Sequence, residues 1–527
     1  MKPPEGSQRQ GAEFSADRPK TLQREDRLGF RHVAQQLAQS IVQQSPPDGF
    51  VVAIEGAWGS GKTSLVNFLA EEIEASERRP LHVVRFEPWI IGDRNGMLSE
   101  LISALASACD AIDEGPGADG RRLKASATKL AGQLKSYASR LGRASAPFAQ
   151  VLAAFGLPLA SLLGGTLGGL AQTADAIDLS KPIEEMKQEI ILALKRIPKR
   201  IAVIVDDLDR LEPAEAVEVL RLIRAVADFP NVIYILSYES SVLAESVQTA
   251  LGVKDGAAFL KKMVQVSFKV PLPEAFDLRR WFSDECLALY AALKGNEIPT
   301  DVQERLAEVC NIEGGLLKTP RDIARTLNAV KLCWPPVAEK VDFPDMVWLQ
   351  LQRLSNEKLY SWIEEYLVEY MAVVDGASVS DFEKSQFSSR LLDHIEAGFA
   401  ISPKSMWRFS QVVPGLKVGS DNDGKKLLFH TDDQSAIGKA MNLRRLASPQ
   451  HYRFYFALSK PSGALDDHVL LSFIASARSN GDLQGPCHSL IENRRPQGGT
   501  MMAALLDRLL HMDDDRVPNE AVPPIVR

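Results

Sequence analysis

The sequence predicts an α/β protein built on a parallel β-sheet with helices on both faces, and three observations support this prediction. Short apolar runs rich in β-branched residues alternate with helix-compatible stretches in the first half of the chain. A loop rich in glycine follows the first of these runs, and a pair of aspartates ends a later one. The last third has apolar residues at helical spacing instead, so we expect a mostly α region there.

Length and composition bound the class of protein. At 527 residues the chain exceeds the size of one hydrophobic core, and its 45% hydrophobic and 24% charged residues are ordinary for globular domains. The net charge of -7 does not favour a nucleic-acid partner, since phosphate backbones attract basic surfaces. The five cysteines form no C-x-x-C pair, which is typical of reduced thiols. The polar amino terminus lacks an apolar leader, and we predict a cytoplasmic location.

The glycine-rich loop follows a strand predicted at 51–54. Its sequence fits the pattern G-x-x-x-x-G-K-[ST], in which backbone N–H groups and a helix N-terminus surround a phosphate. Lys62 would reach the β- and γ-phosphates, and Thr63 would place its hydroxyl on Mg²⁺. The alternative to a phosphate-binding loop is a glycine-rich turn before an ordinary helix. The expected nucleotide-binding residues are Gly56, Ala57, Trp58, Gly59, Ser60, Gly61, Lys62, Thr63 and Ser64.

A second, independent element supports the first. The apolar run 201–205 ends in Asp206 and Asp207, at the place where this class of fold puts the carboxylate that orients Mg²⁺. We assign Asp206 to the metal. Asp207, which would polarise the attacking water, and Lys62 are predicted catalytic residues. The alternative for Asp207 is a cap of the following helix. Together the two elements predict a P-loop NTPase with ATP and Mg²⁺ as cofactors.

Other predicted strands define the branch of the fold. They lie at 82–89, 231–240 and 264–273, with helical stretches between them. An extra strand between the two phosphate-site elements indicates the ATPase type of P-loop protein rather than the GTPase type. The chain has no N-K-x-D tetrapeptide for guanine, so we expect ATP.

The ordered motifs resemble those of the KAP family of P-loop NTPases over roughly residues 17–330. The resemblance implies an ATPase with a helical lid after the sheet, in a family that includes membrane-associated signalling proteins and bacterial proteins linked to phage exclusion. The motifs are EDRLGF at 25–30, GAWGSGKTS at 56–64, RFEPW at 85–89, DDLDR at 206–210, FLKKMVQVSFKVP at 259–271 and TPRDIARTLN at 319–328.

The resemblance also suggests roles for arginines. Arg321 looks like the lid arginine that contacts the phosphates, because a guanidinium pairs bidentately with phosphate oxygens. The alternative is a solvent-facing arginine on a lid helix. Arg210 either acts on the ATP of a neighbouring subunit or pairs locally with Asp207 or Asp209.

The chain departs from the family after the fourth strand. Related sequences often carry an F-D-R-like segment there, and this chain has SYES at 237–240. Ser237 is therefore a weak sensor candidate, and Glu239 is a possible substitute for the usual acidic residue.

The stretch between the two phosphate motifs contains a predicted insertion at 110–178. Residues 121–143 form a basic helix that either binds a membrane or anionic partner, or packs on the domain with a solvated face. Residues 144–174 carry no charge and are long enough to cross a bilayer once. A single crossing would separate Lys62 from Asp206, which excludes it. A re-entrant or interfacial hairpin, a buried helical pair and an oligomer contact remain.

The domain boundaries follow from these patterns. We expect a disordered lead-in at 1–18, a P-loop core at 19–109 and 179–275, an insertion at 110–178, a helical lid at 276–335, a proline-rich hinge at 332–345 and a mostly α partner-recognition region at 346–527.

The function predicted from these parts is an ATP-hydrolysing molecular switch, in which ATP closes the lid onto the sheet domain. The family resemblance places it in bacterial signalling or phage defence. The alternatives are a membrane-associated scaffold that binds ATP with little turnover, and a P-loop phosphotransferase. Expected partners are a protein bound by the C-terminal region, a membrane surface contacted by 121–174 and a second copy of the chain. Membrane contact would be peripheral or re-entrant at the inner face.

Overall fold

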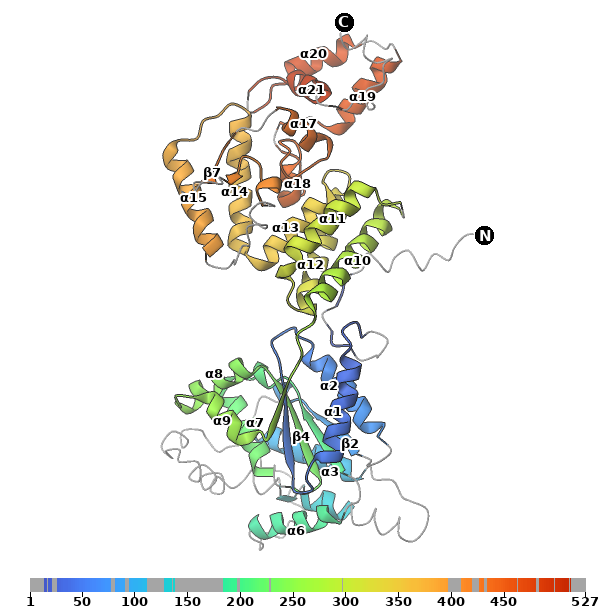
Figure 1. Ribbon diagram of the computed structural model, residues 1–527, viewed down its shortest axis with the longest axis vertical. Coiled ribbons are helices and arrows are strands. Elements are labelled where there is room, and N and C mark those ends of the chain that lie inside the picture. The colour runs from blue at the N-terminus through green and yellow to red at the C-terminus, as the bar shows by residue number, and fades with distance from the viewer. Residues whose placement is uncertain are drawn as a thin grey trace, which may run out of the picture. The chain divides into compact units, whose positions relative to one another are not determined.

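The computed structural model divides into two compact units (Figure 1). The first is Arg18–Leu272, and the second combines Met1–Asp17 with Pro273–Arg527. The structure describes residues 14–16, 18–20, 26–76, 81–90, 94–110, 128–134, 136–137, 183–196, 200–226, 229–295, 297–396, 409–418, 426–430, 434–461, 463–479, 483–496, 498–510 and 512. Most of the lead-in predicted at 1–18 lies outside these residues.

The first unit contains a parallel sheet whose described strands run in the order β2-β3-β4-β1-β5. Strand β4 pairs with β1 on one side and with β3 on the other, which confirms the parallel sheet and the additional strand of the ATPase type. The strands are β1 (Phe50–Glu55), β2 (Leu81–Phe86), β3 (Arg200–Val205), β4 (Val232–Tyr238) and β5 (Val266–Lys269).

Burial explains why the central strands are continuous apolar runs. Every residue of β3 and β4 is buried, as expected for parallel strands covered on both faces. Strand β5 is a short, mostly exposed edge strand that ends at Lys269, well before the predicted end at 273. Pro271 and Pro273 follow directly, and proline cannot donate a hydrogen bond to a strand ladder.

Helices form a layer on each face of this sheet. Apolar residues of α1 and α2 pack on one face, and those of α3, α6, α7 and α8 pack on the other. The helices and 3₁₀ turns of the unit are α1 (Phe30–Gln44), α2 (Lys62–Glu74), η2 (Pro88–Ile90), α3 (Arg94–Asp110), α6 (Ile183–Lys195), η4 (Leu208–Arg210), α7 (Pro213–Val226), α8 (Ser240–Leu251) and α9 (Gly256–Met263).

Part of the predicted insertion packs on the same face of the sheet as α3, α6, α7 and α8. Residues 128–134 are helical, and Leu130, Leu134 and Tyr137 are buried in the same apolar cluster as α3 and α7. Over this stretch the apolar side of the helix packs on the domain, and contact of its basic residues with a membrane or an anionic partner stays a prediction. The uncharged segment 144–174 lies outside the described residues. Within the described residues, no helix has both the length and the apolar character needed to cross a membrane.

The second unit is mostly helical, as predicted. Its aromatic residues form the core, with Trp348, Trp362 and Tyr366 fully buried. Its elements are α10 (Ala275–Lys294), α11 (Thr300–Ile312), η5 (Glu313–Leu316), α12 (Pro320–Cys333), η6 (Pro335–Val337), α13 (Phe343–Ser355), α14 (Glu357–Val374), α15 (Asp381–Glu396), β6 (Lys417–Val418), β7 (Lys426–Leu427), α17 (Gln434–Asn442), α18 (Tyr452–Ala457), α19 (Asp467–Arg478), α20 (Gln484–Glu492) and α21 (Met501–Leu510).

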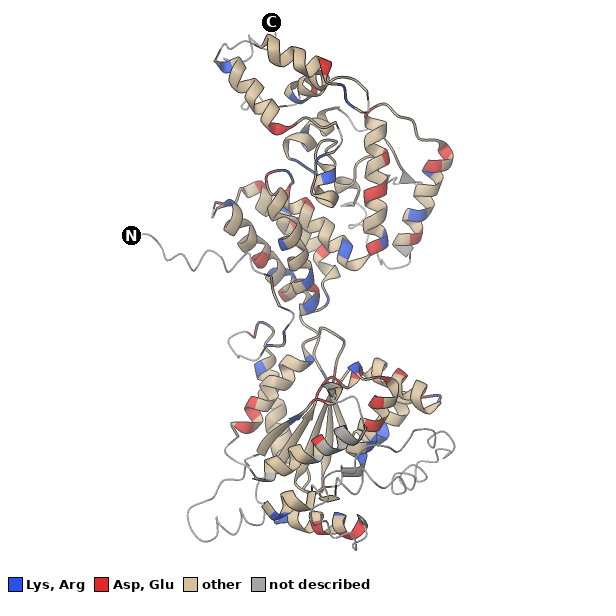
Figure 2. Ribbon diagram, turned by 180° about the vertical axis from the view of Figure 1, so that it is seen from behind, with Lys and Arg blue, Asp and Glu red and all other residues tan. Residues whose placement is uncertain are grey.

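Acidic and basic residues both occur along these helices (Figure 2). Some pair between neighbouring helices, as Arg390 of α15 does with Glu365 of α14. Both side chains are about half exposed, and such pairs contribute little to stability.

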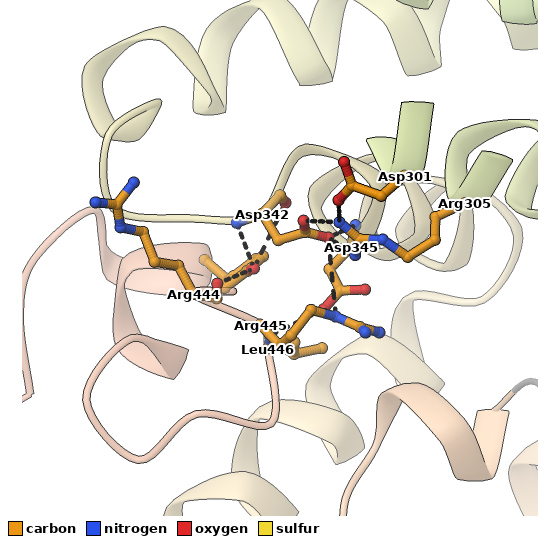
Figure 3. Close-up of polar contacts among 8 residues, drawn as sticks. Asp301, Arg305, Asp342, Asp345, Arg444, Arg445 and Leu446 are labelled. Carbon is orange, nitrogen blue, oxygen red and sulfur yellow. Dashed lines mark hydrogen bonds and ion pairs between the residues drawn. The ribbon is translucent and has the colours of Figure 1, made fainter. Parts of the chain in front are cut away.

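The segment 332–345, which we expected to be a hinge, is instead a packed joint. Trp334 is fully buried, and its ring lies 4.3 Å from that of Phe343. The prolines begin elements here: Pro335 opens η6, and Pro344 occupies the first turn of α13. Proline is favoured at the start of a helix, where its missing N–H is not needed. The segment also carries buried ion pairs, which Figure 3 shows.

Candidate nucleotide-binding site

The glycine-rich loop joins β1 to α2, and its shape requires glycine at two positions. Gly59 and Gly61 have φ angles of 80° and 95°, in the left-handed region. A Cβ atom on Gly61 would also lie 2.5 Å from Cε2 of Phe30 in α1. The predicted EDRLGF motif therefore contributes a residue that packs directly against the loop.

Lys62 lies at the first position of α2, with its ammonium group folded against the loop. Its Nζ atom donates hydrogen bonds to the carbonyl oxygens of Gly56 at 2.7 Å and Ala57 at 3.4 Å. The same atom forms an ion pair with Asp209 Oδ2 at 3.4 Å. The lysine side chain is 7% exposed, so the loop and Asp209 hold the cation in a defined place.

The two predicted aspartates follow β3 directly. Asp206 is buried, and its Oδ1 atom accepts a hydrogen bond from the backbone N–H of Asp207 at 2.9 Å. Asp207 has a φ angle of 59°, in the left-handed region that is uncommon for non-glycine residues. Burial, and then the negative charge of Asp206, raises the pKa of Asp207 to about 6, although Arg210 opposes this shift.

The structure bears on two alternatives that the sequence left open, a capping role for Asp207 and a local partner for Arg210. Asp207 precedes the 3₁₀ turn η4 but makes no capping hydrogen bond with its side chain. Its Oδ1 atom instead lies 3.1 Å from Arg210 Nε. Within this chain Arg210 therefore pairs with Asp207, and its action on the ATP of a neighbouring subunit stays a prediction.

Sequence reasoning missed Asp209 as a site residue. Its side chain is almost fully buried, and Oδ2 accepts hydrogen bonds from Trp58 Nε1 at 2.6 Å and from the backbone N–H of Glu239 at 3.0 Å, beside the Lys62 contact. Asp209 is the third acidic residue of the DDLDR motif, but the sequence does not reveal the 3₁₀ turn that directs it toward the loop. Trp58 was predicted only as part of the loop, and its side chain turns out to bind Asp209.

The remaining loop residues occupy varied surroundings. Thr63 and Ser64 lie in the first turn of α2 and are half-buried. The hydroxyl of Ser64 accepts a hydrogen bond from the backbone of Lys20 at 3.0 Å. The hydroxyl oxygens of Ser60 and Ser237 are buried without a hydrogen-bond partner among the described residues. A sensor role for Ser237 stays a prediction.

Arg321 belongs to the second unit. It is the second residue of α12, whose start is fixed by a capping box between Thr319 and Asp322. Its proposed contact with the nucleotide phosphates stays a prediction.

The site fits a magnesium nucleotide in its donor atoms and charge. In the part of the chain that the structure describes, no group of three or more His, Cys, Asp or Glu side chains is arranged to hold a metal alone. Mg²⁺ needs only one or two protein ligands, because water and phosphate oxygens complete its shell. Thr63, just after the loop, and Asp206, just after β3, suit that role. A bound cation would also offset the charge of adjacent carboxylates.

Comparison with known proteins decides the family. The model of the KAP family P-loop domain matches residues 30–335 of this chain. The chain belongs to the KAP family of P-loop NTPases. Membership of the KAP family implies a nucleotide-binding site in the unit that carries the glycine-rich loop. The family therefore agrees with the resemblance found in the motifs.

One curated relative of this KAP-family chain is the phage T7 exclusion protein of Escherichia coli (strain K12). The two are 31% identical over 494 residues, which is 92% of this chain and 66% of the relative. The chain thus spans just under two thirds of the relative's length.

Solved structures also align with the KAP-family chain. The Aeropyrum pernix ORC2 protein in its ADP form aligns with 10% identity and a TM-score of 0.32, over 77% of this chain and 88% of that one. Cdc6p from Pyrobaculum aerophilum aligns with 10% identity and a TM-score of 0.34, over 85% and 97%.

Proposed function

We propose that this KAP-family protein is a Mg²⁺-dependent ATPase that acts as a molecular switch in defence against phage. The observation that carries the proposal is the placement of Lys62 beside the acidic end of β3, where it pairs with Asp209 at 3.4 Å. A cation held by a glycine loop next to carboxylates is what phosphoryl transfer on a magnesium nucleotide requires. The phage setting is supported by the relative named phage T7 exclusion protein.

Each residue has a distinct task in the proposed reaction. Lys62 would bind the β- and γ-phosphates, exchanging its contacts with the loop carbonyls and Asp209 for phosphate oxygens. Thr63 and Asp206 would hold Mg²⁺, which supplies charge neutralisation on the phosphates when bound. Asp207 would orient the attacking water in its ionised form, and Arg210 helps to keep it ionised.

The proposal is tested by phosphate release from ATP with the purified full chain and Mg²⁺. We expect Lys62→Ala and Asp207→Asn each to lower the turnover number at least about 100-fold, because the first removes the positive charge beside the transferred phosphate and the second removes the carboxylate that orients the attacking water. Glu245→Ala, which removes an exposed carboxylate of α8, is the matched control and should behave as wild type.

Two other results would redirect the proposal. Tight ATP binding without turnover in the wild type would favour the scaffold alternative. ATP consumption that depends on an added acceptor would favour a phosphotransferase.

The phage setting is tested in cells. Cells that express the wild type should plate phage T7 less efficiently than cells that express Lys62→Ala, and equal plating would contradict that setting.

A further inference from the structure

Trp58, in the middle of the glycine-rich loop, is held on two sides although its side chain is exposed. Its relative exposure is 55%, yet both of its N–H groups donate to buried or half-buried carboxylates. The backbone N–H donates to Glu239 Oε2 at 2.8 Å, and the indole Nε1 donates to Asp209 Oδ2 at 2.6 Å. Hydrogen bonds to ionised acceptors are about twice as strong as neutral ones. A tryptophan held this way fixes the loop that carries it.

The two carboxylates are themselves positioned by short, local contacts. The backbone N–H of Glu239 donates to Asp209 Oδ2 at 3.0 Å, so the two residues are joined directly. The other oxygen of Glu239 accepts a hydrogen bond from Ser241 Oγ at 3.2 Å. Glu239 immediately precedes α8, whose Leu243 is fully buried in the core. The N-terminus of α8 therefore acts as a fixed anchor for the loop.

Asp209 connects this arrangement to the phosphate-binding lysine. A single oxygen, Oδ2, accepts from Trp58, from Glu239 and from Lys62 Nζ at 3.4 Å. The Lys62 contact is the longest of the three, and it is the one that a phosphate would compete for. If Lys62 turns toward a phosphate, Asp209 keeps its hydrogen bonds from Trp58 and Glu239.

We propose that Asp209 and Glu239 are positioning residues that form a clamp on Trp58. The clamp fixes the phosphate loop before nucleotide arrives. This inference rests on the proposed function, because it concerns how the same site binds nucleotide. Preorganising a loop raises affinity by lowering the entropy lost on binding. The clamp should therefore act on nucleotide affinity more than on the chemical step.

The affinity test uses a fluorescent ATP analogue and the full chain with Mg²⁺. Glu239→Ala removes the acceptor of the Trp58 backbone N–H and should weaken binding about tenfold, while the turnover number at saturating ATP changes less than about threefold. Glu239→Gln keeps an oxygen at this place and should restore affinity to within about threefold of wild type. Glu245→Ala, on the same helix and exposed, is the control and should bind as wild type.

A spectroscopic readout separates the clamp from a general structural role. Trp58→Phe removes the indole bond to Asp209 and leaves the backbone bond to Glu239 possible. The tryptophan emission of the wild type should change when ADP and Mg²⁺ are added, and most of that change should be absent in Trp58→Phe. In Glu239→Ala the change should be reduced, because Trp58 then keeps only its indole bond to Asp209 and loses the bond from its backbone N–H.

The outcomes distinguish the clamp from the proposed function. Absence of nucleotide binding by the wild type would overturn the proposed function and the clamp with it. Nucleotide binding that is equally tight in wild type and Glu239→Ala would overturn the clamp alone. A Glu239→Gln variant as weak as Glu239→Ala, with unchanged thermal unfolding of both, would also overturn it, since the acceptor oxygen would then not matter.

Discussion

Two clusters of acidic residues in this molecule differ in how their charge is balanced. In the second unit, Asp342 and Asp345 at the start of α13 are each bound by an arginine (Figure 3). Arg305 donates to both oxygens of Asp342 at 2.8 and 2.6 Å, and Arg445 Nε donates to Asp345 Oδ2 at 2.6 Å. Burial and the neighbouring Asp345 raise the pKa of Asp342 to about 6. Burial also acts on Asp345, but Arg445 lowers its pKa overall.

In the first unit the acidic cluster is less completely paired. Asp206, Asp207 and Asp209 lie within four residues of each other in the sequence, and among the described residues Lys62 and Arg210 form ion pairs with them. The Lys62 contact is 3.4 Å long, and Arg210 is about half exposed. In the second unit each buried carboxylate has its own arginine, and the further carboxylate, Asp301, which lies 3.6 Å from Arg305, is exposed. The cluster in the first unit has three carboxylates for two basic groups, and one of these groups is half exposed.

The difference separates a structural joint from a candidate reaction site. A buried ion pair with matched partners holds elements together, and removing one partner leaves a costly buried charge. A surplus of carboxylate next to a glycine loop instead leaves room for a cation from solution, such as Mg²⁺. On this comparison, changes in the first cluster should affect chemistry, and changes in the second should affect folding.

The largest expected effect is on folding, at Arg445. Arg445→Leu removes the arginine bound to Asp345, which is fully buried, and should lower the free energy of unfolding by about 3–5 kcal/mol. Urea denaturation followed by circular dichroism measures it. Arg453→Leu, at an exposed arginine of α18, is the control and should cost less than about 1 kcal/mol. If Lys62→Ala lowered the free energy of unfolding as much as Arg445→Leu, the contrast between the clusters would be lost.

The next prediction concerns the pH dependence of hydrolysis. Since the pKa of Asp207 is raised to about 6, its water-orienting form is lost as the pH falls through 6, and kcat/KM should fall about tenfold per pH unit below that point. Arg210 lowers this pKa, so Arg210→Ala should move the falling limb to higher pH. The profile is measured between about pH 5 and 9 at constant ionic strength, because salt screens interactions between charges. A profile that is flat through pH 6 would mean that Asp207 does not act in its ionised form.

The smallest effect is on stability at the same residue. The pKa of Asp207 is raised in the folded chain from its ordinary value of 3.8 to about 6, so its ionisation destabilises the fold progressively between about pH 4 and pH 6, and the full cost remains at higher pH. Asp207→Asn should therefore raise the free energy of unfolding by about 1 kcal/mol at about pH 8, and this gain should shrink below about pH 6 and disappear near pH 4. Asparagine tolerates the left-handed backbone at this position. A loss of stability at pH 8 would show that the carboxylate is held favourably.

The sequence predicted the parts of the site that follow from strand order and motif spacing. Lys62 and Asp206 could be found because a loop and a strand end have a fixed place in this fold. Asp209 could not, because its direction depends on the short turn η4 and on the tertiary contact with Trp58. The prolines of 332–345 suggested a hinge, but the buried Trp334 shows that tertiary packing decides whether such a segment is loose.

The most direct test of the account is the affinity for ATP with and without Mg²⁺, measured by titration calorimetry on the wild type and on Asp206→Asn. The account predicts that Mg²⁺ strengthens ATP binding by the wild type about tenfold or more, and strengthens it much less in Asp206→Asn, because that change removes the carboxylate assigned to the metal. An equal effect of Mg²⁺ on both proteins, or none on the wild type, would contradict it.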